Sequence, residues 1–116
     1  MVQTRGDLAD KIRNVEKGRL LLIAFTGKTS HLSKGDIAFF MAIHEALFDK
    51  ELAADFLVYT GPISDAMASQ YSLHSFALPK VIVCQGPGKY HEYTGGKQAI
   101  HISRWLKRFR RTETDL

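Results

Sequence analysis

The stretch "LLIAFTGKTSHLSKGD" (residues 21–36) passes from a run of apolar side chains, through a glycine, into a segment patterned like a helix. A near-continuous apolar run is typical of a strand that is buried on both faces of a sheet. We therefore expect a strand over 19–25 and a helix over 34–53, joined by a short loop. A strand that leads into a helix in this way favours an α/β domain.

The loop contains Gly27-Lys28-Thr29, which resembles the end of a nucleotide-binding P-loop. That motif needs an earlier glycine, whose turn lets main-chain amides surround the phosphates. The required position holds Leu22, inside the apolar run. The second expected strand also runs Phe56-Leu57-Val58-Tyr59, without the acidic residue that would hold magnesium. The sequence thus argues against a nucleotide site.

Outside this stretch, apolar periodicity and the positions of glycine and proline predict the remaining elements. Helices are expected over 4–18, 63–73 and 97–111, and strands over 55–60, 78–85 and 89–94, the last at an edge of the sheet. Gly86-Pro87-Gly88 predicts a tight turn and an antiparallel hairpin. The order α-β-α-β-α-β-β-α predicts an α/β domain with a mixed sheet of about four strands flanked by helices, the arrangement of the thioredoxin-like fold.

Spacing within the two longest helices assigns their core faces. In 34–53, Asp36 is the candidate N-cap, and the residues expected to face the core are Ile37, Phe40, Met41, Ile43, Ala46 and Leu47. In 97–111 the inner face is expected to hold Ile102, Trp105, Leu106 and Phe109. The outer face carries Arg104, Lys107, Arg108 and Arg111. We interpret this basic face as solvated rather than nucleic-acid-binding, because no aromatic stacking platform accompanies it.

Length and composition are those of one globular domain: 116 residues, 45% of them hydrophobic and 24% charged. We expect a single domain over 1–116, with its core at about 5–110 and a flexible tail at 111–116. The net charge of +4 implies only weak affinity for acidic surfaces. No apolar run is long enough to span a bilayer, and the amino-terminal "MVQTRGDLAD" has no apolar centre of a signal peptide.

The sequence contains one cysteine, Cys84. A single thiol excludes an internal disulfide and a Cys-x-x-Cys redox pair. Its position in "VIVC", where residues alternate along an expected central strand, predicts a core residue. The five histidines show no metal-binding spacing, so neither a metal nor a cofactor is expected.

Three segments resemble the thioredoxin-like domains of the protein disulfide isomerase family. In "AFTGKTSHLSK" (24–34), Phe25 stands at the strand-end aromatic, Ser30 and Ser33 fall where the two redox cysteines would be, and Lys34 follows them. Leu78-Pro79 before "VIVC" is similar to the family's loop with a cis proline that faces the active site. "YTGGKQAIHISRWLKR" (93–108) looks like the closing pattern of the isomerase domains. The resemblance covers residues 5–110.

The departures from that family pattern imply that redox chemistry is absent. Disulfide exchange needs a stabilised thiolate and a second, resolving thiol, and a serine hydroxyl supplies neither. The buried acid of the catalytic domains would fall at Ala24, and the tryptophan before the first cysteine at Thr29. The resemblance therefore implies a non-catalytic, b-type domain and no enzyme, similar to the cysteine-less domains of the thioredoxin-related transmembrane proteins.

The resemblance also implies a peptide-binding surface at the vestigial redox site. Its residues would be Ser30, His31, Leu32, Ser33, Lys34, Phe76, Leu78 and Pro79. A cis proline would leave the preceding main chain open to pair with an extended peptide. The alternative is purely structural: serines that cap the helix, a solvated loop histidine, and a proline that shapes its loop.

The function that this resemblance favours is a spacer or a binding module, whose partners would be an unfolded client, a partner protein or neighbouring thioredoxin domains, and no nucleic acid. It implies the lumen of the endoplasmic reticulum, with a cytosolic location as the alternative. Two other functions remain open. One is a thioredoxin-fold scaffold in a cytosolic or nuclear complex, which would use the basic last helix. The other is a glutaredoxin- or transferase-type enzyme in which Ser30 would activate glutathione.

Overall fold

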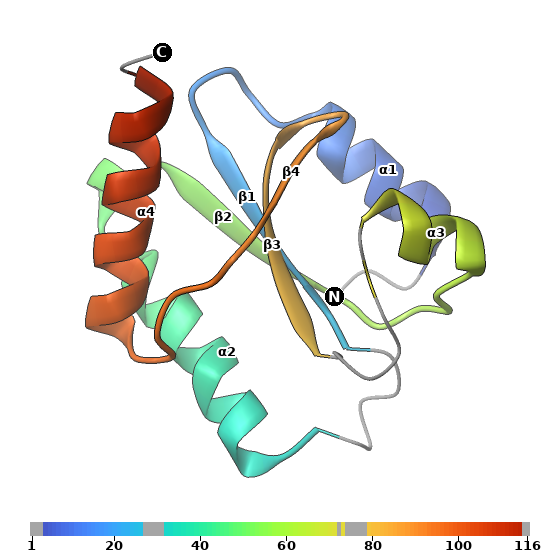
Figure 1. The fold of residues 1–116 in the computed structure, drawn as a ribbon, viewed down its shortest axis with the longest axis horizontal. Helices are drawn as coiled ribbons and strands as arrows, with labels where there is room; N and C mark the ends of the chain where they lie inside the picture. Colours follow the sequence, from blue (N-terminus) through green and yellow to red (C-terminus); the bar gives the residue numbers. More distant parts are fainter. Residues whose placement is uncertain (1–3, 27–31, 72, 74–78, 115–116) are drawn as a thin grey trace.

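The computed structural model describes residues 4–26, 32–71, 73 and 79–114, with side chains as far as Arg110. The elements follow the expected order (Figure 1). The helices are α1 (Arg5–Arg13), α2 (Lys34–Ala46), the 3-10 helix η2 (Lys50–Leu52), α3 (Asp65–Gln70) and α4 (Ala99–Thr114). The strands are β1 (Leu20–Phe25), β2 (Ala54–Tyr59), β3 (Lys80–Gly86) and β4 (Lys89–Glu92).

The four strands form one mixed sheet in the order β2-β1-β3-β4. β1 pairs in parallel with β2 and antiparallel with β3, and β3 pairs antiparallel with β4. The β3–β4 turn uses Gly86 and Gly88 at positive φ of 146° and 78°, a conformation that glycine adopts without steric cost. All six residues of β1 are buried, as the apolar run predicts for a central strand.

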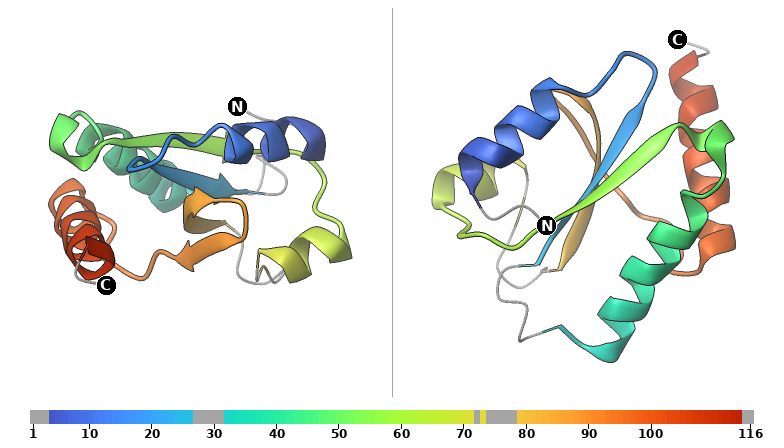
Figure 2. Two further views of the ribbon diagram at one scale, coloured as in Figure 1. Left: turned by 90° about the horizontal axis from the view of Figure 1, so that it is seen from above. Right: turned by 180° about the vertical axis from the view of Figure 1, so that it is seen from behind.

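The helices cover the two faces of the sheet in pairs, α1 with α3 and α2 with α4 (Figure 2). Alternate side chains of β1 divide between the two cores because successive residues of a strand point to opposite faces. Leu21, Ile23 and Phe25 pack on the α1–α3 side. Leu20, Leu22 and Ala24 pack on the α2–α4 side, together with Ile43, Ala46, Ile102 and Leu106.

Three helices are shorter than the sequence predicts, among them α3, which covers Asp65–Gln70 instead of 63–73. α1 ends at Arg13, because the main chain leaves the helical conformation at its C-cap Asn14, with a ψ of 7°, and the next N–H, that of Val15, donates to the carbonyl of Ile12, three residues back. α2 ends at Ala46 instead of continuing to residue 53. The Asp49 side chain accepts a hydrogen bond from the N–H of Glu51 and starts η2, and Ala53 then turns the chain into β2 at a φ of 46°. Local capping therefore ends helices that the apolar pattern alone would extend.

Candidate functional site

Part of the predicted peptide-binding surface lies where β1 ends and β3 begins. Phe25, the last residue of β1, pairs with Lys80, the first residue of β3, so that Pro79 lies at the same end of the sheet as Phe25. Pro79 and Leu32 are half-buried, whereas Ser33 and Lys34 are exposed. The other four predicted residues, Ser30, His31, Phe76 and Leu78, lie outside the described residues.

Ser33 is the N-cap of α2, which confirms the structural alternative for this serine and corrects the assignment of the N-cap to Asp36. The Ser33 hydroxyl accepts a hydrogen bond of 3.0 Å from the Asp36 N–H, and the Asp36 carboxylate accepts one of 2.9 Å from the Ser33 N–H. This reciprocal pair is a capping box, which satisfies two otherwise unpaired amides at the start of the helix. The N-cap thus lies three residues before Asp36, and Ser33 has the structural role that the sequence offered as the alternative to peptide binding.

Cys84 lies in β3 with none of its surface exposed, which confirms the predicted core position. Its Sγ donates to the carbonyl oxygen of Gly86 at 3.4 Å. Burial raises the pKa of the thiol, because the charged thiolate loses its hydration. A neutral, inaccessible thiol is the opposite of what a redox cysteine needs.

We expect Cys84 to react with Ellman's reagent about a hundredfold more slowly in the folded protein than in urea, because the reagent must await an opening of the sheet. The measurement is the release of the coloured thiolate with time, with a Cys84→Ala variant as the blank. A folded-state rate within about tenfold of the unfolded rate would reveal an accessible thiol and would contradict this assignment.

An apolar groove runs along α2 and the adjoining edge of the sheet. We call it the α2 groove; it has a volume of about 730 Å³ and is lined by Ile37, Ala38, Phe40, Met41, Ala42, His44, Glu45, Phe48 and Phe56. Three of its large apolar side chains are exposed: Ile37 by 48%, Met41 by 67% and Phe48 by 73%. Such side chains gathered in one groove, rather than scattered singly, are characteristic of an interaction surface.

The prediction that Ile37 and Met41 face the core is wrong, whereas Ile43 and Ala46 are buried as expected. The reason lies in the composition of α2, which is apolar at every position from Ile37 to Ile43. The sheet can cover only one side of such a helix, so the other side is left in solvent. Phe48 and Phe56 had not been recognised as site residues. The sequence signal for such a surface was that α2 has more apolar residues than one buried helix face can hold.

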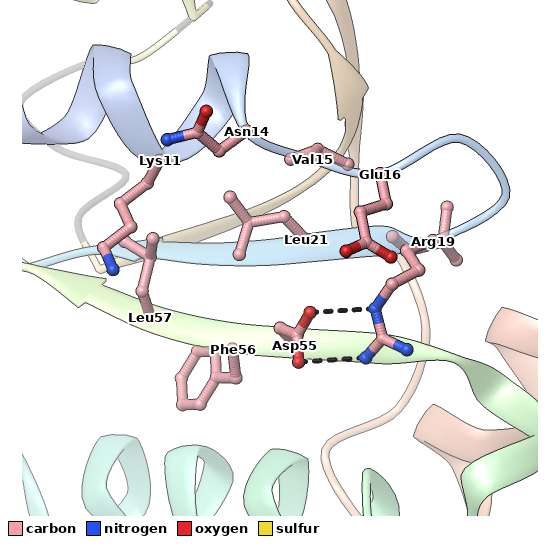
Figure 3. Close-up of a pocket in the computed structure, with 10 residues that line it drawn as sticks. Lys11, Asn14, Val15, Glu16, Arg19, Leu21, Asp55, Phe56 and Leu57 are labelled. Atoms are coloured by element: carbon pink, nitrogen blue, oxygen red, sulfur yellow. Dashed lines mark hydrogen bonds and ion pairs between the residues drawn. The ribbon is translucent and has the colours of Figure 1, made fainter.

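A smaller cavity of about 330 Å³ lies between α1 and the strands β1 and β2 (Figure 3). At one end, Arg19 forms two hydrogen bonds with the Asp55 carboxylate, from Nε at 3.2 Å and from Nη2 at 3.0 Å. These hydrogen bonds raise the pKa of Arg19, which therefore stays charged. The described lining of this cavity has no thiol, hydroxyl or imidazole group. We infer that the Arg19–Asp55 pair has a structural role and holds the start of β1 against β2.

The described residues contain no candidate metal site and no candidate membrane-spanning helix. Among them, no group of three or more histidine, cysteine or acidic side chains could hold a metal ion. In the same part of the chain, each helix is too short or too polar to cross a bilayer. On the basic face of α4, Arg104, Lys107 and Arg108 are exposed as predicted, and Lys107 pairs with Asp49 at 3.3 Å.

No protein-family model matches the sequence, and no curated protein matches it significantly. Among solved structures, the J-Trx1 fragment of ERdj5 is similar, with a TM-score of 0.64 and 13% sequence identity. The match covers 98% of this chain and 51% of that structure, so the chain spans about half of its length. At this level of identity the similarity bears on the fold alone. It confirms the expected architecture: the protein has a thioredoxin-like α/β fold.

Proposed function

We propose that the protein is a redox-inactive, thioredoxin-like module of the b type that binds an extended apolar segment of an unfolded client or partner protein in the α2 groove. The observation that carries this proposal is the exposure of Ile37, Met41 and Phe48 along a single groove. Burying an exposed side chain of this size contributes about 1.5 to 3 kcal/mol, enough for a few such contacts to drive association.

The edge of the sheet supports an extended polypeptide as the occupant. β2 pairs only with β1 in the described sheet, and the N–H groups of Leu20 and Thr26 donate to the carbonyls of Ala53 and Tyr59. In a parallel ladder, alternate residues of a strand bond to the same neighbour. The main-chain groups of Ala54, Phe56 and Val58 therefore point away from β1. An added strand would satisfy them while its side chains reach the groove beside Phe56.

The environments of Cys84 and Ser33 support a binding role over an enzymatic one. Cys84 is buried, and the Ser33 hydroxyl is engaged in capping α2. We therefore propose that insulin reduction and glutathione turnover are both absent, and measurable turnover in either assay would contradict the proposal.

We expect Met41→Glu to weaken binding of a fluorescein-labelled apolar peptide by about tenfold or more, because the substitution places a charge in an apolar contact. Ile100→Glu is the matched control: Ile100 is a comparable apolar side chain, 53% exposed, but lies on α4 outside the groove. Its affinity should stay within about twofold of wild type. Fluorescence anisotropy gives the affinities, and unchanged circular dichroism shows that both variants are folded.

Amide chemical shifts and sedimentation distinguish the other occupants. Client binding should shift the resonances of α2 and β2, whereas shifts confined to α4 would indicate a scaffold and contradict the proposal. If the wild-type protein sediments as a dimer and Met41→Glu as a monomer, the groove is the interface between two copies of this chain. That result would also overturn client binding.

A further inference from the structure

A cationic cleft lies at the end of the sheet opposite to the start of α2. It has a volume of about 680 Å³, and its lining includes Lys17, Arg19, Lys89, His91 and Arg110. These residues come from the loop before β1, from β4 and from α4, which meet at this end of the molecule (Figure 1). No carboxylate belongs to the described lining of the cleft.

The positive charge of the cationic cleft is only partly neutralised. Arg19 is paired with Asp55. Arg110 donates to the main-chain carbonyls of Gly18, Leu52 and Ala53, at 2.9, 2.7 and 3.0 Å. Within the described part of the chain, no carboxylate forms an ion pair with the exposed Lys17 or Lys89. The cleft is therefore complementary to an anionic ligand.

The strand beside the cationic cleft has a free edge. In the described sheet β4 pairs only with β3, and the N–H of Tyr93 donates to the carbonyl of Val81. Because bonding alternates along an antiparallel pair, the main-chain groups of Tyr90 and Glu92 point away from β3. Glu92, the acidic residue of β4 itself, forms an ion pair with Lys80 on β3. An extended chain can therefore pair with β4.

The aromatic rings near the cleft favour a protein over a nucleic acid. Phe109 lies parallel to Trp105, with ring centroids 5.3 Å apart and planes inclined by 7°. His91 approaches Phe109 in an edge contact, with centroids 4.9 Å apart. These rings pack on one another, whereas binding to single-stranded nucleic acid uses ring faces that are open to bases.

We infer that the cationic cleft binds a carboxylate-rich, extended segment of a partner protein, which pairs with β4 and places acidic side chains against Lys17, Lys89 and His91. Main-chain pairing supplies contacts that do not depend on sequence, and the charges of Lys17 and Lys89 select for acidic side chains. The site is separate from the α2 groove, so this inference does not depend on client binding.

The test uses the full chain and a fluorescein-labelled polyglutamate peptide, with polyglutamine and oligothymidylate of equal length for comparison. The Lys17→Glu/Lys89→Glu double variant should bind polyglutamate about tenfold or more weakly than wild type. The Lys34→Glu/Lys50→Glu double variant has the same net charge, with both substitutions outside the cleft, and should stay within about twofold of wild type. Wild-type affinity should fall as salt is added, and polyglutamine should not bind.

Four results would overturn the inference. They are the absence of saturable polyglutamate binding, an equal loss in both double variants, tighter binding of oligothymidylate than of polyglutamate, and loss of polyglutamate binding in Met41→Glu. An equal loss in both double variants would mean that polyglutamate responds only to the net charge of the protein. Tighter binding of oligothymidylate would identify a nucleic-acid site. Circular dichroism and urea midpoints establish that all variants are folded. Binding of the apolar peptide by Lys17→Glu/Lys89→Glu should be unchanged, which separates this test from that of the α2 groove.

Discussion

Phe25→Ala is expected to lower the free energy of unfolding by about 3 to 5 kcal/mol, the largest effect that we predict. Phe25 is fully buried at the end of β1, with its ring centroid 5.7 Å from that of Tyr59 and 5.2 Å from that of Tyr71. Tyr59 is held in place by a hydrogen bond of 2.7 Å to the carbonyl of Pro62. Tyr71 in turn packs against Tyr90, with ring centroids 4.9 Å apart, so the neighbouring rings cannot close the cavity that truncation leaves. Urea unfolding followed by circular dichroism measures the loss.

Phe25→Leu is the control, because leucine keeps most of the apolar volume. We expect it to cost only about 1 to 2 kcal/mol, in proportion to the smaller loss of buried carbon. The slope of unfolding free energy against urea should be the same in both variants, which shows that the comparison concerns stability alone. A loss below about 1 kcal/mol for Phe25→Ala would mean that the end of β1 is not packed as described.

The fold was predictable because its strongest features are local. The apolar run at 19–25 indicates a central strand, and β1 is buried at all six positions. The turn at 86–88 indicates a hairpin, and β3 and β4 are paired there. The period of the last helix places Ile102 and Leu106 inward, and both are fully buried. In each case the predictive pattern lies within a short segment of neighbouring residues.

The surfaces were less predictable because they depend on what the rest of the chain covers. Ile37 and Met41 follow the same apolar pattern as Ile43, and only the position of the sheet decides which of them is exposed. Arg110 is comparable: it belongs to a basic run, yet it bonds the carbonyl of Gly18, 92 positions away in sequence. A contact between residues so far apart cannot be predicted from the spacing of neighbouring residues. The cationic cleft likewise combines residues from three distant segments.

Gly95→Ala is expected to lower the free energy of unfolding by about 2 to 3 kcal/mol, the second-largest effect on stability. A Cβ at this position would lie 2.6 Å from the Tyr93 hydroxyl oxygen and 2.9 Å from Cδ1 of Trp105. Neither ring is free to move away. The Tyr93 hydroxyl donates to the carbonyl of Gly96, and Trp105 is stacked on Phe109 and bonded to Thr94. This close approach gives a physical reason for the glycine in the closing segment of the sequence.

Gly6→Ala is the matched control for this prediction, because the same chemical change should have the opposite sign. Gly6 lies in the first turn of α1, and a Cβ there would meet no atom within 4 Å. Alanine is the better helix former, so the variant should gain up to about 1 kcal/mol. Urea midpoints measured side by side test both substitutions. If Gly95→Ala were neutral while Gly6→Ala stabilised the protein, Gly95 would not lie against Tyr93 and Trp105 as described.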